Sequence, residues 1–370
     1  MKVPFVDLKA QYQSIKEEID QSIDKVIESA SFIGGEEVKF FERDFASILG
    51  VQHCVGVANG TDAIYIALKM LGIGKGDEVI TVANSWIATS ETITQVGAKP
   101  VFVDIDPDTY TIDVSKIESK INGATRAIIP VHLYGQAAQI SSIKQICDKK
   151  QLMLIEDCAQ SHLTEDDGKY VGTFGNVSTY SFYPGKNLGA YGDAGCIVTD
   201  DNTLAEKCRM YANHGALVKH QHKIEGVNSR LDTIQAAILR AKLPYLKNWT
   251  SSRIKNAKLY TEKLSKIEDL FLPEVRPNTV HSFHLYVVRT PRRDELRKFL
   301  EEKGIQTAIH YPTALPNMEA YKYLGHTSEE FPIATQYQNQ ILSLPMYAEL
   351  SENQIDYVCN QIHNFFEVAK

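Results

Sequence analysis

Apolar and polar positions follow two different periods along this chain. Residues 10–29 carry isoleucines and a valine at helical spacing, and a second amphipathic segment runs to Leu49 after the Gly34-Gly35 break. From residue 55 onward, short apolar runs alternate with helical segments. The predicted strands are 55–58, 78–82, 101–105, 127–132, 153–156, 179–182 and 196–199, and predicted helices between them include 62–71 and 89–96. This alternation predicts an α/β fold with a mainly parallel sheet covered on both faces.

The pattern changes near residue 245. A long polar helix is predicted over residues 245–264, followed by a strand at 284–288 and a helix at 294–303. We therefore expect two domains. Residues 1–245 would form a large α/β domain with an N-terminal helical arm, and residues 246–370 a smaller C-terminal α+β domain.

Composition narrows the class of protein. The 370 residues are 44% apolar and carry a net charge of −7, so charge gives no argument for binding nucleic acid or anionic membranes. No apolar run of about 18 residues occurs, so no membrane span is expected. The six cysteines are scattered without a Cys-x-x-Cys pair, which indicates reduced thiols and a cytoplasmic location.

One lysine and one carboxylate suggest the chemistry. Lys186 follows the Pro184-Gly185 turn, and Asp157 ends an apolar run that begins at Leu152. A lysine amine can form a Schiff base with an aldehyde cofactor, and a buried carboxylate can keep the ring nitrogen of that cofactor protonated. Pyridoxal phosphate needs both groups to act as an electron sink. Alone, either residue would be expected to face solvent; together they favour a cofactor site.

The neighbours of Lys186 support this interpretation. Phe182, Tyr183 and Pro184 are expected to form an apolar wall that lowers the pKa of the amine by desolvation. Ser181, at the end of a strand, could offer its hydroxyl to a phosphate.

Other positions could complete the site. Asn59-Gly-Thr-Asp62 lies between a strand and a helix with Thr61 as a possible N-cap, so its backbone N–H groups could bind a phosphate. The same residues also fit an ordinary capped helix. Gln160 could donate to the ring hydroxyl, and Trp86 could stack on the ring or belong to the core.

The histidines do not indicate a metal. His214, His220 and His222 lie close together, but their spacing fits no tetrahedral zinc pattern, and a loop that contacts substrate is favoured. His310-Tyr311-Pro312 could be either a structural turn or part of a cleft wall.

Taken in order, six motifs make the chain resemble the DegT/DnrJ/EryC1/StrS family of sugar aminotransferases, which has the aspartate-aminotransferase (type I) fold. The motifs are Pro4-Phe-Val-Asp-Leu8, Asn59-Gly-Thr-Asp-Ala63, Ile155-Glu-Asp-Cys-Ala-Gln160, Ser181-Phe-Tyr-Pro-Gly-Lys-Asn-Leu188, Gly226-Val-Asn-Ser-Arg-Leu-Asp232 and His310-Tyr-Pro312.

The resemblance implies a role for each matching residue. Lys186 would be the Schiff-base lysine and Asp157 the partner of the pyridinium nitrogen. The other cofactor contacts would be Gly60, Thr61, Asp62, Trp86, Gln160 and Ser181, together with Asn228 from the neighbouring subunit of a homodimer. The residues implied to lie near the nucleotide sugar are Tyr183, Lys219, His310 and Tyr311.

The resemblance also implies a reaction. An amino group would pass from L-glutamate through pyridoxal phosphate to the C3 ketone of a dTDP-3-keto-6-deoxyhexose, because the segments 183–185 and 226–230 look closest to such enzymes. Amination at C4 of a UDP- or dTDP-4-keto sugar is the nearest alternative. A pyridoxal phosphate-dependent sugar dehydratase would replace Lys186 with histidine. A non-catalytic regulator would need a binding appendage for which the motifs leave no room.

Overall fold

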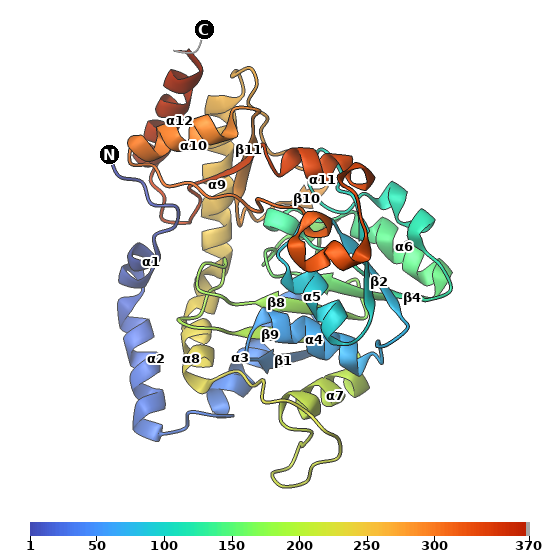
Figure 1. The fold of residues 1–370 in the computed structure, drawn as a ribbon. Coiled ribbons are helices and arrows are strands. Elements are labelled where there is room, and N and C mark those ends of the chain that lie inside the picture. Colours follow the sequence, from blue (N-terminus) through green and yellow to red (C-terminus); the bar gives the residue numbers. More distant parts are fainter. Residues whose placement is uncertain (368–370) are drawn as a thin grey trace.

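A seven-stranded sheet forms the centre of the computed structural model, which describes residues 1–367 (Figure 1). Five neighbouring strands are parallel, whereas β9 runs antiparallel to both β8 and β1. In spatial order the strands are β1 (His53–Val57), β9 (Gly195–Thr199), β8 (Val177–Ser181), β5 (Met153–Asp157), β4 (Thr125–Ile129), β2 (Glu78–Val82) and β3 (Lys99–Val103). The prediction of a mainly parallel α/β sheet is confirmed, with strand ends displaced by a few residues.

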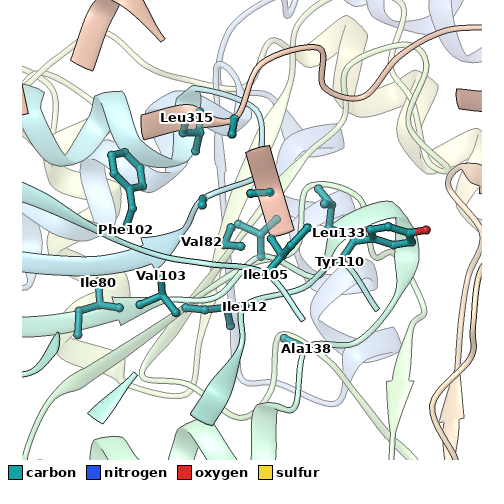
Figure 2. Close-up of a cluster of buried hydrophobic side chains, with 14 of the residues drawn as sticks. Ile80, Val82, Phe102, Val103, Ile105, Tyr110, Ile112, Leu133, Ala138 and Leu315 are labelled. Atoms are coloured by element: carbon teal, nitrogen blue, oxygen red, sulfur yellow. The ribbon is translucent and has the colours of Figure 1, made fainter. Parts of the chain in front are cut away.

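Helices cover both faces of this sheet because its strands are apolar on both sides. In β4, Ala127 and Ile129 pack on one face and Ile128 on the other. One face is covered by α4 (Gly60–Met70), α5 (Ala88–Gln95) and α7 (Asn202–Ala212). The other is covered by α3 (Glu36–Leu49), α6 (Ile140–Lys150) and α8 (Thr233–Lys242). Figure 2 shows part of the core on this second face, where side chains of β2 and β3 pack in one cluster with Leu315 of the C-terminal part.

The N-terminal arm is two helices, α1 (Leu8–Ser14) and α2 (Lys16–Ser29), where one helix was predicted. The break falls at Ile15, whose backbone φ of −136° is not helical. The Ile15 side chain is buried beside Ile238 and Trp249, so tertiary packing overrides the helical period at this point. The arm therefore lies along α8 (Figure 1).

The C-terminal part has a core of its own. It contains α9 (Leu246–Leu264), α10 (Arg293–Glu302), α11 (Pro332–Tyr337), α12 (Glu352–Glu367) and an antiparallel pair, β11 (Tyr286–Arg289) with β12 (Ile341–Leu344). The first residues of the chain join this core, since Val3 forms a bridge to Ile305. We propose a domain boundary near residue 245, with residues 1–6 packed across it.

Several short elements complete the fold. A small antiparallel sheet contains β6 (Glu165–Asp166), β7 (Lys169–Tyr170) and β10 (Thr279–Val280). The 3-10 helices are η1 (Val114–Lys116), η2 (Glu118–Lys120), η3 (Leu133–Gly135), η4 (Leu243–Tyr245), η5 (Leu315–Asn317), η6 (Glu319–Leu324) and η7 (Ser328–Glu330). All six cysteines are buried free thiols. Within residues 1–367, no helix is long and apolar enough to cross a membrane.

Candidate active site

A cavity of about 590 Å³ opens at the carboxyl ends of the parallel strands, where ligands bind in open α/β sheets. Its wall combines the start of α4, the end of β5, the turn that carries Lys186 and residues of the C-terminal part. The residues expected from the sequence that line it are Gly60, Thr61, Trp86, Asp157, Gln160, Ser181, Tyr183, Lys186, His310 and Tyr311. The fold thus gathers ten separately predicted positions around one space.

Lys186 is held by a tight turn. Its backbone N–H donates to the Tyr183 carbonyl at 2.8 Å. The turn closes so tightly that a Cβ on Gly189 would lie 2.3 Å from the Pro184 carbonyl oxygen. Burial lowers the pKa of the Lys186 amine to about 8, against the opposing effect of the negative charge on Asp157. An appreciable fraction of this amine is therefore neutral and nucleophilic near neutral pH.

The prediction that Phe182 belongs to an apolar wall beside Lys186 is wrong. This side chain points into the core on the other face, 5.3 Å from the rings of Phe41 and Phe45. Successive strand residues face opposite sides, so Ser181 lies at the cavity and Phe182 does not. Tyr183 does line the cavity, although 59% of it is exposed.

Asp157 ends β5 as a buried carboxylate, 4% exposed. Thr89 donates its hydroxyl hydrogen to Oδ2 at 2.8 Å, and the Ala159 N–H donates to Oδ1 at 3.1 Å. Burial raises the pKa of Asp157, while these donors and the charge of Lys186 act in the opposite direction. The position fits a carboxylate that pairs with a cationic ring nitrogen.

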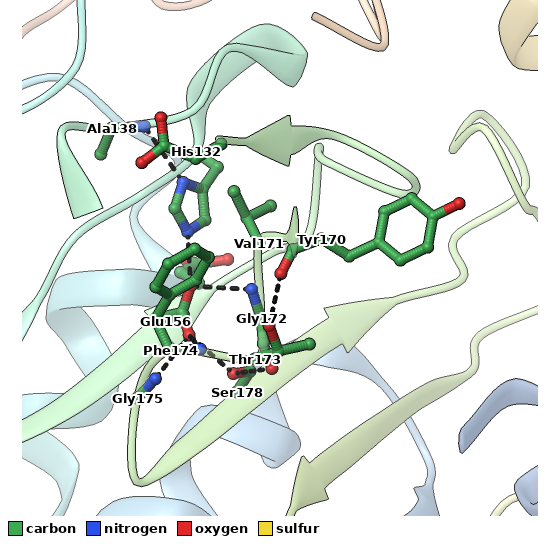
Figure 3. Close-up of polar contacts among 12 residues, drawn as sticks. His132, Ala138, Glu156, Tyr170, Val171, Gly172, Thr173, Phe174, Gly175 and Ser178 are labelled. Carbon is green, nitrogen blue, oxygen red and sulfur yellow. Dashed lines mark hydrogen bonds and ion pairs between the residues drawn. The ribbon is translucent and has the colours of Figure 1, made fainter. Parts of the chain in front are cut away.

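Glu156 has a separate, structural role that sequence reasoning missed. Its carboxylate accepts backbone N–H bonds from Gly172, Phe174 and Gly175 at 2.7–2.8 Å (Figure 3). Burial alone would raise the pKa of Glu156, but these donors and His132 outweigh it, and the pKa is lowered. The residue anchors the loop 170–176 against β5.

His132 is a further hydrogen-bond donor to the Glu156 carboxylate. Its Nδ1 accepts the Ala138 N–H at 3.1 Å, so Nε2 carries the hydrogen and donates to Glu156 at 3.1 Å. With Cys158, these residues bring three possible metal-ligating atoms within 4.8 Å of one another. Because His132 and Glu156 already satisfy each other, hydrogen bonding accounts for the cluster.

Asn59, which also lines the cavity, is the N-cap of α4, so the prediction of Thr61 as N-cap is wrong. Asn59 has extended backbone angles and its side chain accepts the Asp62 N–H at 2.8 Å. Gly60 starts the helix close to Ser181: a Cβ on Gly60 would lie 2.7 Å from the Ser181 Cβ. The helix start and the Ser181 hydroxyl form a cradle suited to an anion.

Asp62 lies in the first turn of α4 but turns its carboxylate away from this cradle. Its Oδ2 accepts the hydroxyl hydrogen of Ser229 at 2.7 Å, and Ser229 accepts the Ala58 N–H at 3.2 Å. The structure therefore gives Asp62 a bracing role between α4 and the segment before α8, in place of the expected cofactor contact.

Gln160 has a defined orientation. Its Oε1 accepts the Tyr134 N–H at 2.8 Å, which leaves Nε2 to donate to the Tyr311 hydroxyl at 2.9 Å. Trp86 is 58% exposed and its ring lies 5.6 Å from that of Tyr311. His310 lines the cavity and burial lowers its pKa to about 4. The motif at 310–312 is therefore part of the cavity wall.

Two further predicted residues lie outside the cavity of their own chain. Lys219 and Asn228 are exposed on the loop between α7 and α8, which projects from the body of the molecule (Figure 1). His214, His220 and His222 belong to the same exposed loop.

The chain is similar to known proteins over most of its length. The profile of the DegT/DnrJ/EryC1/StrS aminotransferase family matches residues 13–363. A protein of Geobacillus stearothermophilus described as "Pleiotropic regulatory protein" is 46% identical over 99% of both chains. The dTDP-3-amino-3,6-dideoxy-alpha-D-galactopyranose transaminase of Aneurinibacillus thermoaerophilus is 43% identical over 98% of this chain and 99% of that one. The UDP-N-acetyl-3-dehydro-alpha-D-glucosamine 3-aminotransferase of Acidithiobacillus ferrooxidans is 41% identical over 97% of each.

The fold agrees with these sequence relationships. The crystal structure of S. venezuelae DesV, in complex with a ketimine intermediate, superposes with a TM-score of 0.97. The two chains are 40% identical, and 99% of each is covered.

Proposed function

Since the chain belongs to the DegT/DnrJ/EryC1/StrS aminotransferase family, we propose that it aminates the C3 ketone of a dTDP-3-keto-6-deoxyhexose. L-Glutamate would donate the amino group, and the products would be a dTDP-3-amino-3,6-dideoxyhexose and 2-oxoglutarate. The chain is a pyridoxal phosphate-dependent nucleotide-sugar aminotransferase, like the transaminases of this family to which it is similar.

One observation carries the proposal: Lys186 and Asp157 line the same cavity as the start of α4. Pyridoxal phosphate needs an amine that can be neutral, a carboxylate for its ring nitrogen and donors for its phosphate. Lys186, Asp157 and the cradle of Gly60 and Ser181 supply these groups. The residues present therefore fit the cofactor.

Each residue has a separate task. When bound, pyridoxal phosphate supplies an aldehyde that exchanges amino groups and a ring that accepts electrons. The Lys186 amine holds the cofactor and carries the proton to and from the reacting carbon. The Asp157 carboxylate would keep a proton on the ring nitrogen. Gln160 Nε2 donates one hydrogen to the Tyr311 hydroxyl, and its second hydrogen would be available to the ring hydroxyl.

The choice of substrate rests on the relatives and on the cavity mouth. Two relatives are named for an amino group at C3, one on a dTDP-sugar and one on a UDP-sugar. They therefore support C3 as the site of amination more strongly than they support dTDP as the nucleotide. Tyr183, His310 and Tyr311 line the cavity, where they could contact a sugar. Their polar groups combined with ring surfaces suit a pyranose.

We propose that the protein acts as a homodimer. The arm, the segment that follows it and the projecting loop expose large apolar side chains, which are Ile27, Phe32, Ile33, Leu217, Val218 and Ile224. Because Asn228 and Lys219 lie on that loop, they could reach the cavity of a second copy. Mixing Lys186→Ala with Asn228→Asp should restore part of the activity that each lacks alone, and failure to restore it would contradict shared sites.

The six free thiols support the expected cytoplasmic location.

The decisive experiment presents the purified enzyme and L-glutamate with a panel of 3-keto and 4-keto sugar nucleotides. We expect 2-oxoglutarate release with a dTDP-3-keto-6-deoxyhexose and a new amine at C3 by NMR. An amine at C4 would favour the alternative. If none of the 3-keto sugar nucleotides releases 2-oxoglutarate, the proposed substrate is wrong.

A further inference from the structure

Two hydroxyl groups connect the Asp157 carboxylate to the cavity wall. Thr89, on the first turn of α5, donates to Asp157 Oδ2 at 2.8 Å, and Ser85 Oγ lies 3.1 Å from Thr89 Oγ1. Thr89 is 1% exposed and Ser85 is 3% exposed, and Ser85 lines the cavity. The single hydroxyl hydrogen of Thr89 goes to the carboxylate, so Ser85 must be the donor to Thr89. The bonds therefore run in one direction, from Ser85 to Thr89 to Asp157.

We propose that Thr89 is the positioning residue that holds the Asp157 carboxylate in place for the ring nitrogen of the cofactor, and that Ser85 orients Thr89. The inference rests on the proposed function, because the ring is that of pyridoxal phosphate.

The geometry gives Thr89 this role. Among residues 1–367, each carboxylate oxygen of Asp157 has one donor, the Thr89 hydroxyl for Oδ2 and the Ala159 N–H for Oδ1. Two donors on two oxygens fix the plane of the carboxylate while leaving lone pairs for a ligand. Without Thr89, Oδ2 would keep only solvent or the cofactor as a partner.

The hydroxyl also favours the ionised form. Burial raises the pKa of Asp157, and the Thr89 hydrogen bond lowers it. Loss of that bond would raise the pKa further, so at a given acidic pH more of the carboxyl would be protonated. The other titratable groups that act on Asp157 electrostatically are Lys186, His132, Tyr311 and Cys158.

The chain offers a matched set of variants. Thr89→Val removes the hydroxyl with almost no change of shape, whereas Thr89→Ser keeps it. Thr92→Val makes the same chemical change one turn along α5 at a fully buried site, whose hydroxyl bonds to the Ala88 and Thr89 carbonyls. Ser85→Ala tests the outer member of the pair.

The test measures dissociation constants of pyridoxamine phosphate and pyridoxal phosphate from apoenzyme across a pH series. Pyridoxamine phosphate is the more direct probe, because it has no aldehyde to react with Lys186. A hydrogen bond to a charged group corresponds to roughly 10- to 100-fold in an equilibrium constant, and we expect Thr89→Val to weaken binding by that factor. We also expect the acid limb of its binding profile to move to higher pH. Ser85→Ala should change both quantities in the same direction but less.

The controls decide between positioning and general damage to α5. Thr89→Ser should bind within about threefold of wild type, and Thr92→Val should keep the wild-type pH profile. Wild-type affinity and pH profile in Thr89→Val, or an equal loss in Thr92→Val, would overturn the inference while leaving the proposed function intact. A wild-type protein that binds neither cofactor form would overturn both.

Discussion

Glu156 and Asp157 are neighbours on β5, yet their carboxylates lie on opposite faces of the sheet. Glu156 accepts hydrogen bonds from the loop 170–176 and from His132, whereas Asp157 accepts one from Thr89 of α5 and lines the cavity. Alternation along a strand separates the two. The Glu156 carboxylate therefore stabilises the scaffold, and we propose that the Asp157 carboxylate serves the cofactor.

Replacing Lys186 with alanine should abolish transamination, because the amine both holds the cofactor and carries the proton. A general acid–base contribution alone corresponds to about 10²- to 10⁴-fold in rate. Binding of pyridoxamine phosphate should persist, since that form needs no covalent attachment. The measurements are 2-oxoglutarate release and pyridoxamine phosphate titration. A variant that transaminates at the wild-type rate would refute the assigned role.

The rate at which apoenzyme takes up pyridoxal phosphate should depend on the protonation of Lys186. Burial lowers the pKa of this amine to about 8, and only the neutral amine attacks an aldehyde. The rate should therefore rise with pH, pass its midpoint near that value and level off above it. Stopped-flow absorbance, with hydride trapping and peptide mass to locate the attachment, checks this. A midpoint near 10.5, the ordinary pKa of a lysine side chain, would mean that the amine is not desolvated.

Glu156→Gln should destabilise the protein by about 2–4 kcal/mol, because an amide hydrogen would replace one of the acceptors that three backbone N–H groups and His132 require. Urea unfolding of both proteins measures the change. Asp148→Asn, at an exposed ion pair with Lys144, is the matched control and should change stability by about 0.5 kcal/mol or less.

The same residue predicts a pH effect. The pKa of Glu156 is lowered in the folded protein, so its contribution is present above the ordinary value of 4.5 and is lost as the pH falls through the folded value. Glu156→Gln should remove that part of the acid dependence of the unfolding free energy. An unchanged acid dependence would mean that other groups account for it.

Gly60→Ala should weaken cofactor binding by about tenfold and cost about 1–3 kcal/mol in stability, because the new Cβ would lie 2.7 Å from Ser181 Cβ. Apoenzyme titration and thermal unfolding test the two effects. Gly123→Ala, where an added Cβ meets open space, should leave both unchanged. Equal effects of the two substitutions would show that the contact with Ser181 is unimportant.

Local patterns in the sequence were sufficient for the sheet and for the centre of the site. Strand–helix alternation predicted the strands because burial on both faces makes them largely apolar runs, as in β9, whose five residues are all buried. Lys186 follows a tight turn and Asp157 ends a buried strand. Both could be singled out because burying a charged group costs folding free energy, which a functional role would explain.

The remaining features depend on contacts between distant residues. Thr89 and Asp157 are on different elements, so no local sequence pattern predicts their hydrogen bond. Asp62 resembled a phosphate neighbour, but Ser229, far along the chain, determines where its carboxylate points. The predicted N-terminal helix is interrupted at Ile15 because the Ile15 side chain is buried against α8.

The amino-acid order alone therefore determined the strands of the main sheet and singled out the two side chains that we propose carry the chemistry, because both follow from periodicity and from the cost of burying charge. The tertiary structure decided which hydroxyls, amides and backbone groups surround those side chains. Hydrogen bonds depend on distances of a few tenths of an ångström between atoms that only the folded chain brings together.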